Sequence, residues 1–339
     1  MKDTYPYRFL FLFVLLLVSF GINISFGSVE IPFSATLKEL FTGVSSNDSW
    51  SYIIKEYRLP KAFTAILVGS GLSLSGLLMQ TLFRNPLAGP FVLGISSGAS
   101  LGAAFLIMGS GVFSLGVFLV NDISLAIASS IGSVLVLLAV IAMARKVKDT
   151  MALLIIGLMF GSITAAVVTV LSYFAKAEEL QQYIYWSFGT VGNLSSSQVI
   201  LLTVICLLGL LLSILSIKSL NALLLGENYA KSLGVRIKRA RFLIILATGL
   251  LAGSVTAFAG PIAFIGLAVP HLTRQLFNTT DHKILVPGVI VYGAILLLIC
   301  DTIAQLPSSS YVLPINAITS IVGAPIVIWL LVRKRKMIF

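Results

Sequence analysis

Residues 199–217 read VILLTVICLLGLLLSILSI, a run that contains no charged side chain. A helix of about 20 apolar residues is what the hydrocarbon core of a bilayer requires. The rest of the chain has the same character, because 58% of its 339 residues are hydrophobic and only 10% are charged. A soluble protein averages roughly 25% charged residues. We therefore predict an all-α, polytopic membrane protein with residues 1–339 forming one transmembrane domain.

Nine further apolar stretches bring the number of candidate membrane spans to about ten. The candidates cover residues 9–26, 63–83, 91–109, 123–144, 151–174, 199–217, 242–258, 262–277, 284–303 and 314–332. The first resembles a secretory signal, but no convincing small-x-small cleavage site follows it. We expect it to be retained as a helix.

Basic residues set the predicted orientation. If the N-terminus is cytoplasmic and the spans alternate, the outside receives only Lys38, Lys55, Arg58, Lys61 and Lys176 of the 23 lysines and arginines. The positive-inside rule then predicts that both termini are cytoplasmic. The net charge of +11 is therefore interpreted as an orientation signal, and we expect no nucleic-acid partner.

Two kinds of local pattern concern the packing of the spans. The tripeptides Ala88-Gly89-Pro90 and Ala259-Gly260-Pro261 follow spans of opposite direction, as an inverted repeat would require. Chance or ordinary loop chemistry is the alternative. Glycines and serines four residues apart, such as Gly98 with Gly102 and Gly69 with Ser73, predict close helix packing.

Few side chains suggest catalysis or metal binding. Cys206 and Cys300 lie inside apolar runs, and His271 and His282 have no cysteine or paired carboxylate beside them, so we expect no metal site. Asp301, the one titratable group clearly inside a span, is interpreted as a hydrogen-bonded structural residue. The chain has no Gly-Lys dipeptide and hence no phosphate-binding loop of the GxxxxGK[ST] type. We expect no catalytic residue, no enzyme activity and no bound cofactor.

The segment 218–241 is too polar to cross a membrane. Its sequence favours two short amphipathic helices broken at glycine, which would offer an apolar stripe to a cytoplasmic partner. A helix on the membrane surface, with its lysines toward anionic lipid, is the alternative.

Several stretches, taken in order, resemble the FecCD family, the permease subunits of type II ATP-binding-cassette importers for ferric siderophores, haem and cobalamin. They are 58–61 (RLPK), 84–90 (RNPLAGP), 93–99 (LGISSGA), 220–221 (LN), 233–235 (LGV), 260–267 (GPIAFIGL), 270–274 (PHLTR) and 323–325 (GAP). The resemblance covers the chain from the second span onward.

The resemblance implies ten helices, a second permease copy, two ATPase subunits that use the ATP, and a periplasmic or lipid-anchored binding protein. Docking of the binding protein would fall to Arg58, Lys61 and Gln305. Lys61 stands where the family has a second arginine, and Gln305 where the cobalamin permease has a third basic residue. Simple interfacial anchoring is the alternative for Arg58 and Lys61.

The resemblance also implies a cytoplasmic gate and a segment that couples to the ATPases. The gate residues would be Asn85, Leu87, Thr150 and Met151, although a turn or loop cap also explains Asn85. The coupling residues would be Leu220, Asn221, Gly226, Glu227, Ser232, Leu233, Gly234 and Val235.

The expected function is therefore that of an importer permease in the bacterial cytoplasmic membrane. A ferric siderophore is the first expected cargo, with haem or cobalamin as alternatives. An ion-driven secondary transporter is the competing class, and a membrane receptor or scaffold is a third.

Overall fold

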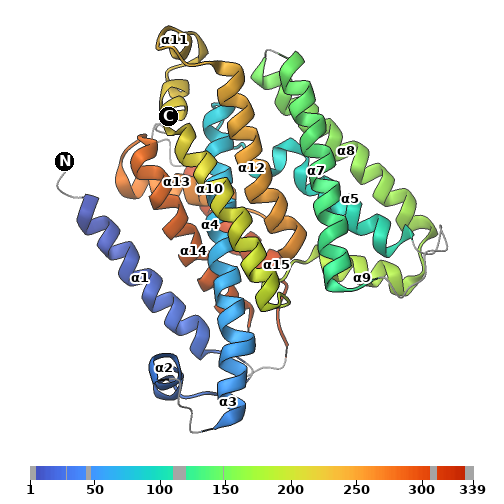
Figure 1. Cartoon of the computed structure of the whole chain (residues 1–339), viewed down its shortest axis with the longest axis vertical. Coiled ribbons are helices and arrows are strands. Elements are labelled where there is room, and N and C mark those ends of the chain that lie inside the picture. The colour runs from blue at the N-terminus through green and yellow to red at the C-terminus, as the bar shows by residue number, and fades with distance from the viewer. Residues whose placement is uncertain are drawn as a thin grey trace.

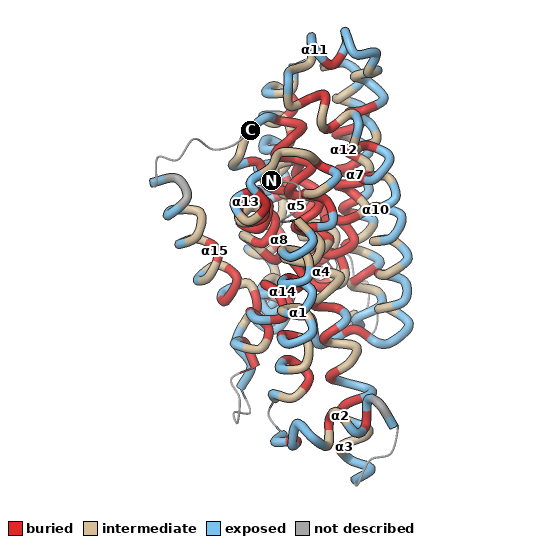
Figure 2. The backbone as a smooth tube through the Cα atoms, turned by 90° about the vertical axis from the view of Figure 1, so that its left-hand side faces the viewer, coloured by how far each residue is buried: buried red, intermediate tan, exposed pale blue. Residues whose placement is uncertain are grey.

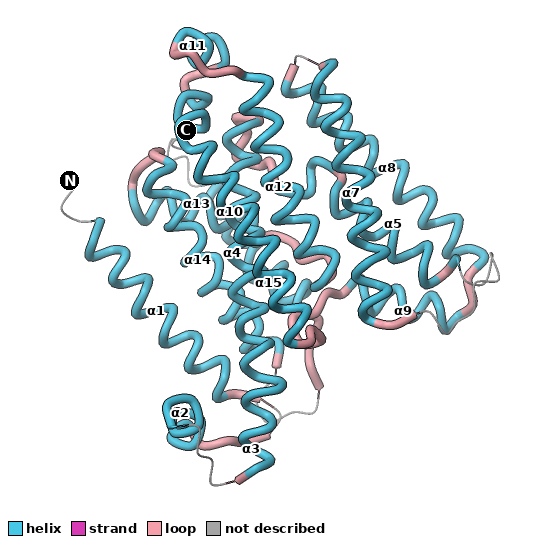
Figure 3. Tube along the Cα trace, in the orientation of Figure 1, coloured by secondary structure: helices cyan, strands magenta, loops and turns pink. Residues whose placement is uncertain are grey.

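Apolar helices build the protein, whose computed structural model describes residues 5–27, 29–42, 47–109, 120–147, 149–305 and 311–332. No strand occurs in these ranges (Figure 3), so the all-α prediction is confirmed. Lys2, Lys148 and the basic run 333–336, which contribute to the predicted orientation, lie outside the described residues.

Seven helices in the described ranges are long and apolar enough to cross a membrane. They are α1 (Tyr5–Ser25), α4 (Leu59–Leu82, continued from α3, Asp48–Tyr52, through the π-helix η2, Ile53–Arg58), α7 (Asp122–Lys146), α8 (Thr150–Phe174), α10 (Ser196–Leu224), α12 (Ile237–Ala259) and α14 (His282–Ala304). Shorter apolar helices occupy the other predicted spans: α5 (Ile95–Ile107), α13 (Ile265–Phe277) and α15 (Ile315–Val332). The remaining helices are α2 (Phe33–Thr42), α9 (Ala177–Ser187) and α11 (Glu227–Ser232).

Two of the ten predicted spans are helices too short to cross the hydrocarbon core. At 1.5 Å per residue, the 13 residues of α5 and of α13 extend about 20 Å, less than the hydrocarbon core of about 30 Å. A 3₁₀ turn, η3 (Pro90–Leu93), precedes α5, and irregular chain precedes α13. A helix thus lies at each of these two predicted stretches but is shorter than the stretch, because glycine and proline interrupt it before its first residue.

These two 13-residue helices also strengthen the evidence for an internal repeat. Each follows one of the two Ala-Gly-Pro tripeptides, and each begins after a residue with positive φ, Gly94 at 71° and Phe264 at 65°. The preceding helices, α4 and α12, run in opposite directions (Figure 1). Matching breaks on antiparallel helices are what an inverted repeat produces.

Helices α4, α12 and α14 form the centre of the bundle, whereas α1, α8 and α10 expose most of their surface (Figure 2). Glycines allow neighbouring helices to touch, α4 with α14 and α5 with α7. A Cβ on Gly69 would lie 2.2 Å from the carbonyl oxygen of Gly293, and one on Gly98 would lie 2.5 Å from that of Gly132. The predicted role of the regularly spaced small residues in packing is confirmed.

The segment 218–241 differs from the prediction of two short helices. Its first part continues α10 to Leu224, and the chain turns only at Gly226, where φ is 103°. The short helix α11 follows, and a second turn at Gly234, with φ of 81°, leads into α12. The apolar run before Gly226 favoured continuation of the long helix over a new start.

Candidate functional site

The residues singled out in the sequence gather at the two ends of α4. Arg58 and Lys61 lie at its N-terminal end, and Leu82 and Arg84 at its C-terminal end lie beside the α11 segment (Figure 1). The 24 residues of α4 separate these ends by about 36 Å. The protein therefore presents two polar sites on opposite faces of the bundle.

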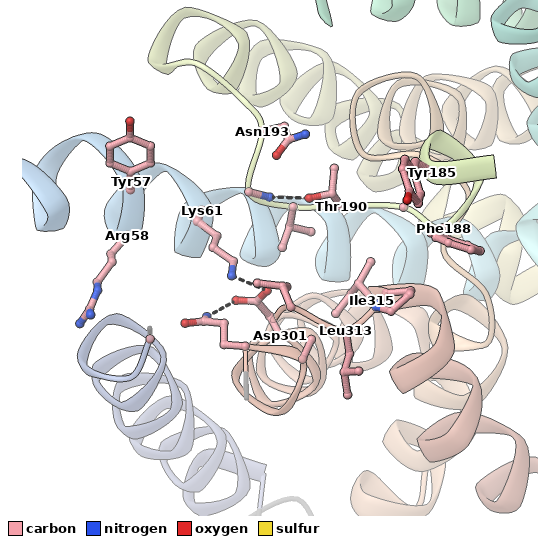
Figure 4. Close-up of a pocket in the computed structure, with 18 of the residues that line it drawn as sticks. Tyr57, Arg58, Lys61, Tyr185, Phe188, Thr190, Asn193, Asp301, Leu313 and Ile315 are labelled. Carbon is pink, nitrogen blue, oxygen red and sulfur yellow. Dashed lines mark hydrogen bonds and ion pairs between the residues drawn. The ribbon is translucent and has the colours of Figure 1, made fainter. Parts of the chain in front are cut away.

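The first site is a cavity of about 690 Å³. It is lined by Arg58, Lys61, Asp301 and Gln305 together with aromatic and polar side chains, among them Tyr57, Tyr185, Phe188 and Asn193 (Figure 4). The structure thus brings together all three residues that the resemblance implies for docking. We call this cavity the Lys61 cavity.

Asp301 organises the wall of the Lys61 cavity. Its Oδ1 lies 3.2 Å from Lys61 Nζ, and its Oδ2 accepts hydrogen bonds from Asn23 Nδ2 and Gln305 Nε2, both at 2.8 Å. Asp301 is 2% exposed, so its charge is balanced by one cation and two amides rather than by water. The predicted structural role of Asp301 is confirmed.

Arg58 points away from Lys61 in Figure 4 and binds the end of α1. Its Nη1 donates to the carbonyl oxygens of Ile24 at 2.8 Å and of Ser25 at 2.7 Å, and its Nη2 donates to that of Val29. Carbonyls left over at a helix C-terminus attract a cation. In this structure Arg58 therefore caps the C-terminal end of α1, and Lys61 is the more exposed of the two basic side chains.

Removing the carboxylate of Asp301 is expected to destabilise the protein. Asp301→Ala would leave Gln305 Nε2 without its acceptor and would remove one of the three acceptors of Asn23 Nδ2, at a cost of about 2–3 kcal/mol. The loss should stay below the roughly 3–5 kcal/mol of a fully buried ion pair, because Lys61 keeps some solvent contact. Thermal unfolding of the purified protein would measure it. Asp301→Asn, which keeps an acceptor oxygen, should lose less, and an alanine variant as stable as the parent would contradict the assignment.

At the opposite end, Asn85 and Leu87 lie in the loop after α4. Asn85 Oδ1 accepts from the backbone N–H of Leu87 at 2.9 Å, and His271 Nε2 lies 2.8 Å from the carbonyl oxygen of Pro86. Asn85 thus caps its own turn, as the alternative reading held, while Leu87 is exposed. His271 ties this loop to α13.

The other two predicted gate residues start α8. Thr150 Oγ1 donates a hydrogen bond to Glu227 Oε1 at 3.2 Å. Glu227 Oε1 also accepts a hydrogen bond from Arg241 Nη2 of α12 at 2.5 Å. Met151 is exposed. No hydrogen bond among the described residues joins Thr150 or Met151 to Asn85 or Leu87. The structure therefore links Thr150 to the predicted coupling segment instead.

The predicted coupling residues and their neighbours in the chain divide into a buried group and an exposed group. Leu220 is fully buried, and Val235 N–H donates to the carbonyl oxygen of Ala230 at 3.0 Å. Leu225, Tyr229 and Leu233 are each more than half exposed. These three exposed apolar side chains lie on α11 and directly on either side of it, and we call them the α11 stripe. Ser232 and Gly234 are exposed beside it.

Comparison with known proteins identifies relatives of this chain. The model of the FecCD transport family matches residues 15–333. The chain belongs to the FecCD transport family. The vitamin B12 import system permease protein BtuC of Klebsiella pneumoniae subsp. pneumoniae is 38% identical over 331 residues, which cover 97% of this chain and 94% of that one. BtuC of Salmonella typhi is 38% identical over 283 residues, covering 83% and 84%.

Two solved structures resemble this FecCD family member. One is an inward-facing conformation of a metal-chelate type ABC transporter, with a TM-score of 0.83, 29% identity, and coverage of 97% of this chain and all of that one. PsaBC from Streptococcus pneumoniae, with a TM-score of 0.55 and 16% identity over 88% of this chain and 94% of that one, shares the fold. The relatives are permeases, so the prediction of a membrane transport subunit that is not itself an enzyme is confirmed.

A buried polar cluster joins α10, α4 and α14 in this FecCD family member. Asn221 Oδ1 lies 2.7 Å from His282 Nδ1, His282 Nε2 lies 2.8 Å from Thr81 Oγ1, and Asn221 Nδ2 donates to Asp281 Oδ1 at 2.7 Å. Burial alone would raise the pKa of Asp281, but the hydrogen bonds from Lys283 N–H and Asn221, with the nearby charges of Lys283 and His282, lower it. Asn221 therefore ties the end of α10 to the start of α14.

Sequence reasoning missed the link between Asp301 and the predicted docking residues. The spacing of Asp301 and Gln305 by four residues was a usable signal, because such pairs meet on one helix face. Asn23 and Lys61 come from other helices, and no local pattern predicts that they meet Asp301. The aromatic side chains of Tyr57, Tyr185 and Phe188 were missed for the same reason.

Proposed function

We propose that this chain is the permease subunit of an ABC importer that carries a metal chelate across the bacterial cytoplasmic membrane. The observation that carries the proposal is the FecCD family match over residues 15–333. The likeness to a metal-chelate type transporter over the whole chain supports it. The relatives named for vitamin B12 import favour cobalamin as the first cargo to test. A ferric siderophore, the expectation from the sequence, is the second.

In this proposal the α11 end is cytoplasmic and receives the ATPase subunits. The α11 stripe supports the assignment, because an exposed apolar strip beside charged residues is typical of a helix that docks into a partner's groove. Arg241, Glu227 and Thr150 connect this segment to the start of α8. ATP-driven movement of α11 would thus reach a predicted gate residue, Thr150, through the hydrogen bond from Thr150 to Glu227.

The Lys61 cavity would receive the binding protein on the opposite, outer face. Lys61 is better placed than Arg58 to contact the binding protein. Arg58 is only 8% exposed and is hydrogen-bonded to three carbonyl groups. An acidic partner would compete with Asp301 for Lys61. The permease itself contributes a pathway, gates and two docking surfaces, and a second copy would complete the pathway.

Transport in proteoliposomes tests this function. With the cognate ATPase, ATP and binding protein, we expect uptake of labelled cobalamin or of a labelled ferric chelate, and no uptake when any one of these components is left out. A proton or sodium gradient without the ATPase should drive none. Uptake by the permease alone on an ion gradient would instead establish the secondary transporter.

A further inference from the structure

A basic recess opens between the C-terminal end of α7 and the N-terminal end of α12, at the same end of the molecule as α11 (Figure 1). Its volume is about 30 Å³, and the residues that line it are three cations and a set of apolar side chains, Arg145, Lys238, Arg241, Ile141, Phe242 and Ile245. A single water needs about 10–15 Å³ measured in this way. The recess therefore has room for about two water-sized groups, so a phosphate would rest at its mouth with one or two oxygens inside.

The charges at the recess are unbalanced. Arg241 forms its floor and is already paired with Glu227. Arg145 and Lys238 are exposed at the rim, and neither forms an ion pair with a described residue. The first turn of α12 has no side-chain cap, and its positive dipole end lies in the same segment. An anion bound here would pair with the two rim cations, which have no ion pair among the described residues.

The surface that leads to the recess indicates what kind of anion binds. Ile131, Leu135 and Leu138 are exposed on α7 and form an apolar strip along this membrane helix. Leu138 and Arg145 are seven residues apart, about two helical turns, so they share a face. An apolar strip that ends in paired cations matches acyl chains joined to a phosphate, whereas a free phosphate would gain nothing from the strip.

We propose that the recess between α7 and α12 binds the phosphate of an anionic glycerophospholipid, held by Arg145 and Lys238 with its acyl chains along Leu138 and Leu135. Glu227 pairs with Arg241, and the lipid phosphate would provide the negative charge for Arg145 and Lys238. This site needs neither cargo nor ATPase. Its success or failure is therefore separate from that of the proposed transport function.

Lipid binding to the purified full-length chain tests the site. Native mass spectrometry during titration with phosphatidylglycerol or phosphatidylcholine would give the affinity for each lipid. We expect the parent to prefer phosphatidylglycerol. The variant Arg145→Gln with Lys238→Gln should bind it about 30-fold more weakly, the equivalent of about 2 kcal/mol for two cations, with unchanged binding of phosphatidylcholine.

The matched control removes the same charge from the neighbouring positions. Lys146→Gln with Arg239→Gln changes two exposed cations on the same helices that do not line the recess, and it should keep the preference for phosphatidylglycerol. An equal loss in both double variants would overturn the proposal, because it would show diffuse attraction without a site. Unchanged binding in the recess variant would also overturn it.

Competition separates the lipid from a free anion. Glycerol 3-phosphate at millimolar concentration carries the same phosphate without acyl chains, and it should leave the bound phosphatidylglycerol in place. Displacement of the lipid by this compound would overturn the lipid assignment.

Discussion

Gly76→Ala is expected to disrupt the packing of α4 against α13 and to destabilise the protein more than the loss of any single polar contact. A Cβ at residue 76 would lie 1.7 Å from the carbonyl oxygen of Gly266 and 2.5 Å from its carbonyl carbon. These are backbone atoms, so no side-chain rotation can relieve the clash. Overpacking usually costs about 1–3 kcal/mol, and we expect a cost of at least about 3 kcal/mol here.

The effect should reach the loop at the end of α4 that faces α13. His271 of α13 lies 2.8 Å from the carbonyl oxygen of Pro86, so a shift of α13 moves the segment that contains Asn85 and Leu87. Heating the detergent-purified protein and following the intact fraction by size-exclusion chromatography would measure the loss. The matched control is Gly161→Ala, because a Cβ there meets only Ser97 Oγ, at 3.4 Å. Equal stability of the two variants would show that the contact between α4 and α13 is not as close as described.

Gly234→Arg should abolish ATP-driven uptake while leaving the permease folded. No atom lies within 4 Å of a Cβ at residue 234, so the arginine side chain would project outward beside Leu233 of the α11 stripe. A cation in an apolar docking surface loses its hydration without gaining a partner, which costs several kcal/mol. We expect uptake in reconstituted vesicles to fall at least about tenfold.

Gly234→Ala provides the control for backbone strain. The φ of residue 234 is 81°, and any side chain there costs about 1–2 kcal/mol. The alanine variant shares that cost without the bulk and the charge, so it should keep most of the uptake. Uptake that persists in the arginine variant, with the ATPase bound, would contradict a docking role for the α11 stripe. An equal loss in both variants would assign the effect to the backbone.

Several features of the fold follow from local sequence alone. Long uncharged runs such as residues 199–217 can only be helices in a membrane, because the bilayer offers no other partner for backbone N–H and C=O groups. For this reason a helix lies at each of the ten predicted stretches. The lengths of α5 and α13 were harder to predict, because apolar residues in a loop and in a helix contribute equally to hydropathy.

The candidate site was predictable only in part. The resemblance named Arg58, Lys61 and Gln305 as a group, and the structure places all three at one cavity. The partners of these residues were not predictable, because Asn23 and Asp301 are separated by 278 positions in the chain. The same holds for Thr150 and Glu227, whose hydrogen bond connects two segments that were expected to act separately.

The amino-acid sequence by itself determined the class of this protein: a polytopic helical bundle with small residues at regular spacing. These properties depend on composition and short-range periodicity, which each segment has before it packs. Only the tertiary structure decided which basic side chains are paired within the chain and which can bind another molecule. It binds Arg58 to the carbonyl groups at the end of α1, pairs Lys61 with Asp301, and gives Arg145 and Lys238 no ion pair with a described residue. The physical reason is that the groups around a charged side chain decide whether it is paired or accessible. In a membrane protein these groups come from helices that are far apart in the chain.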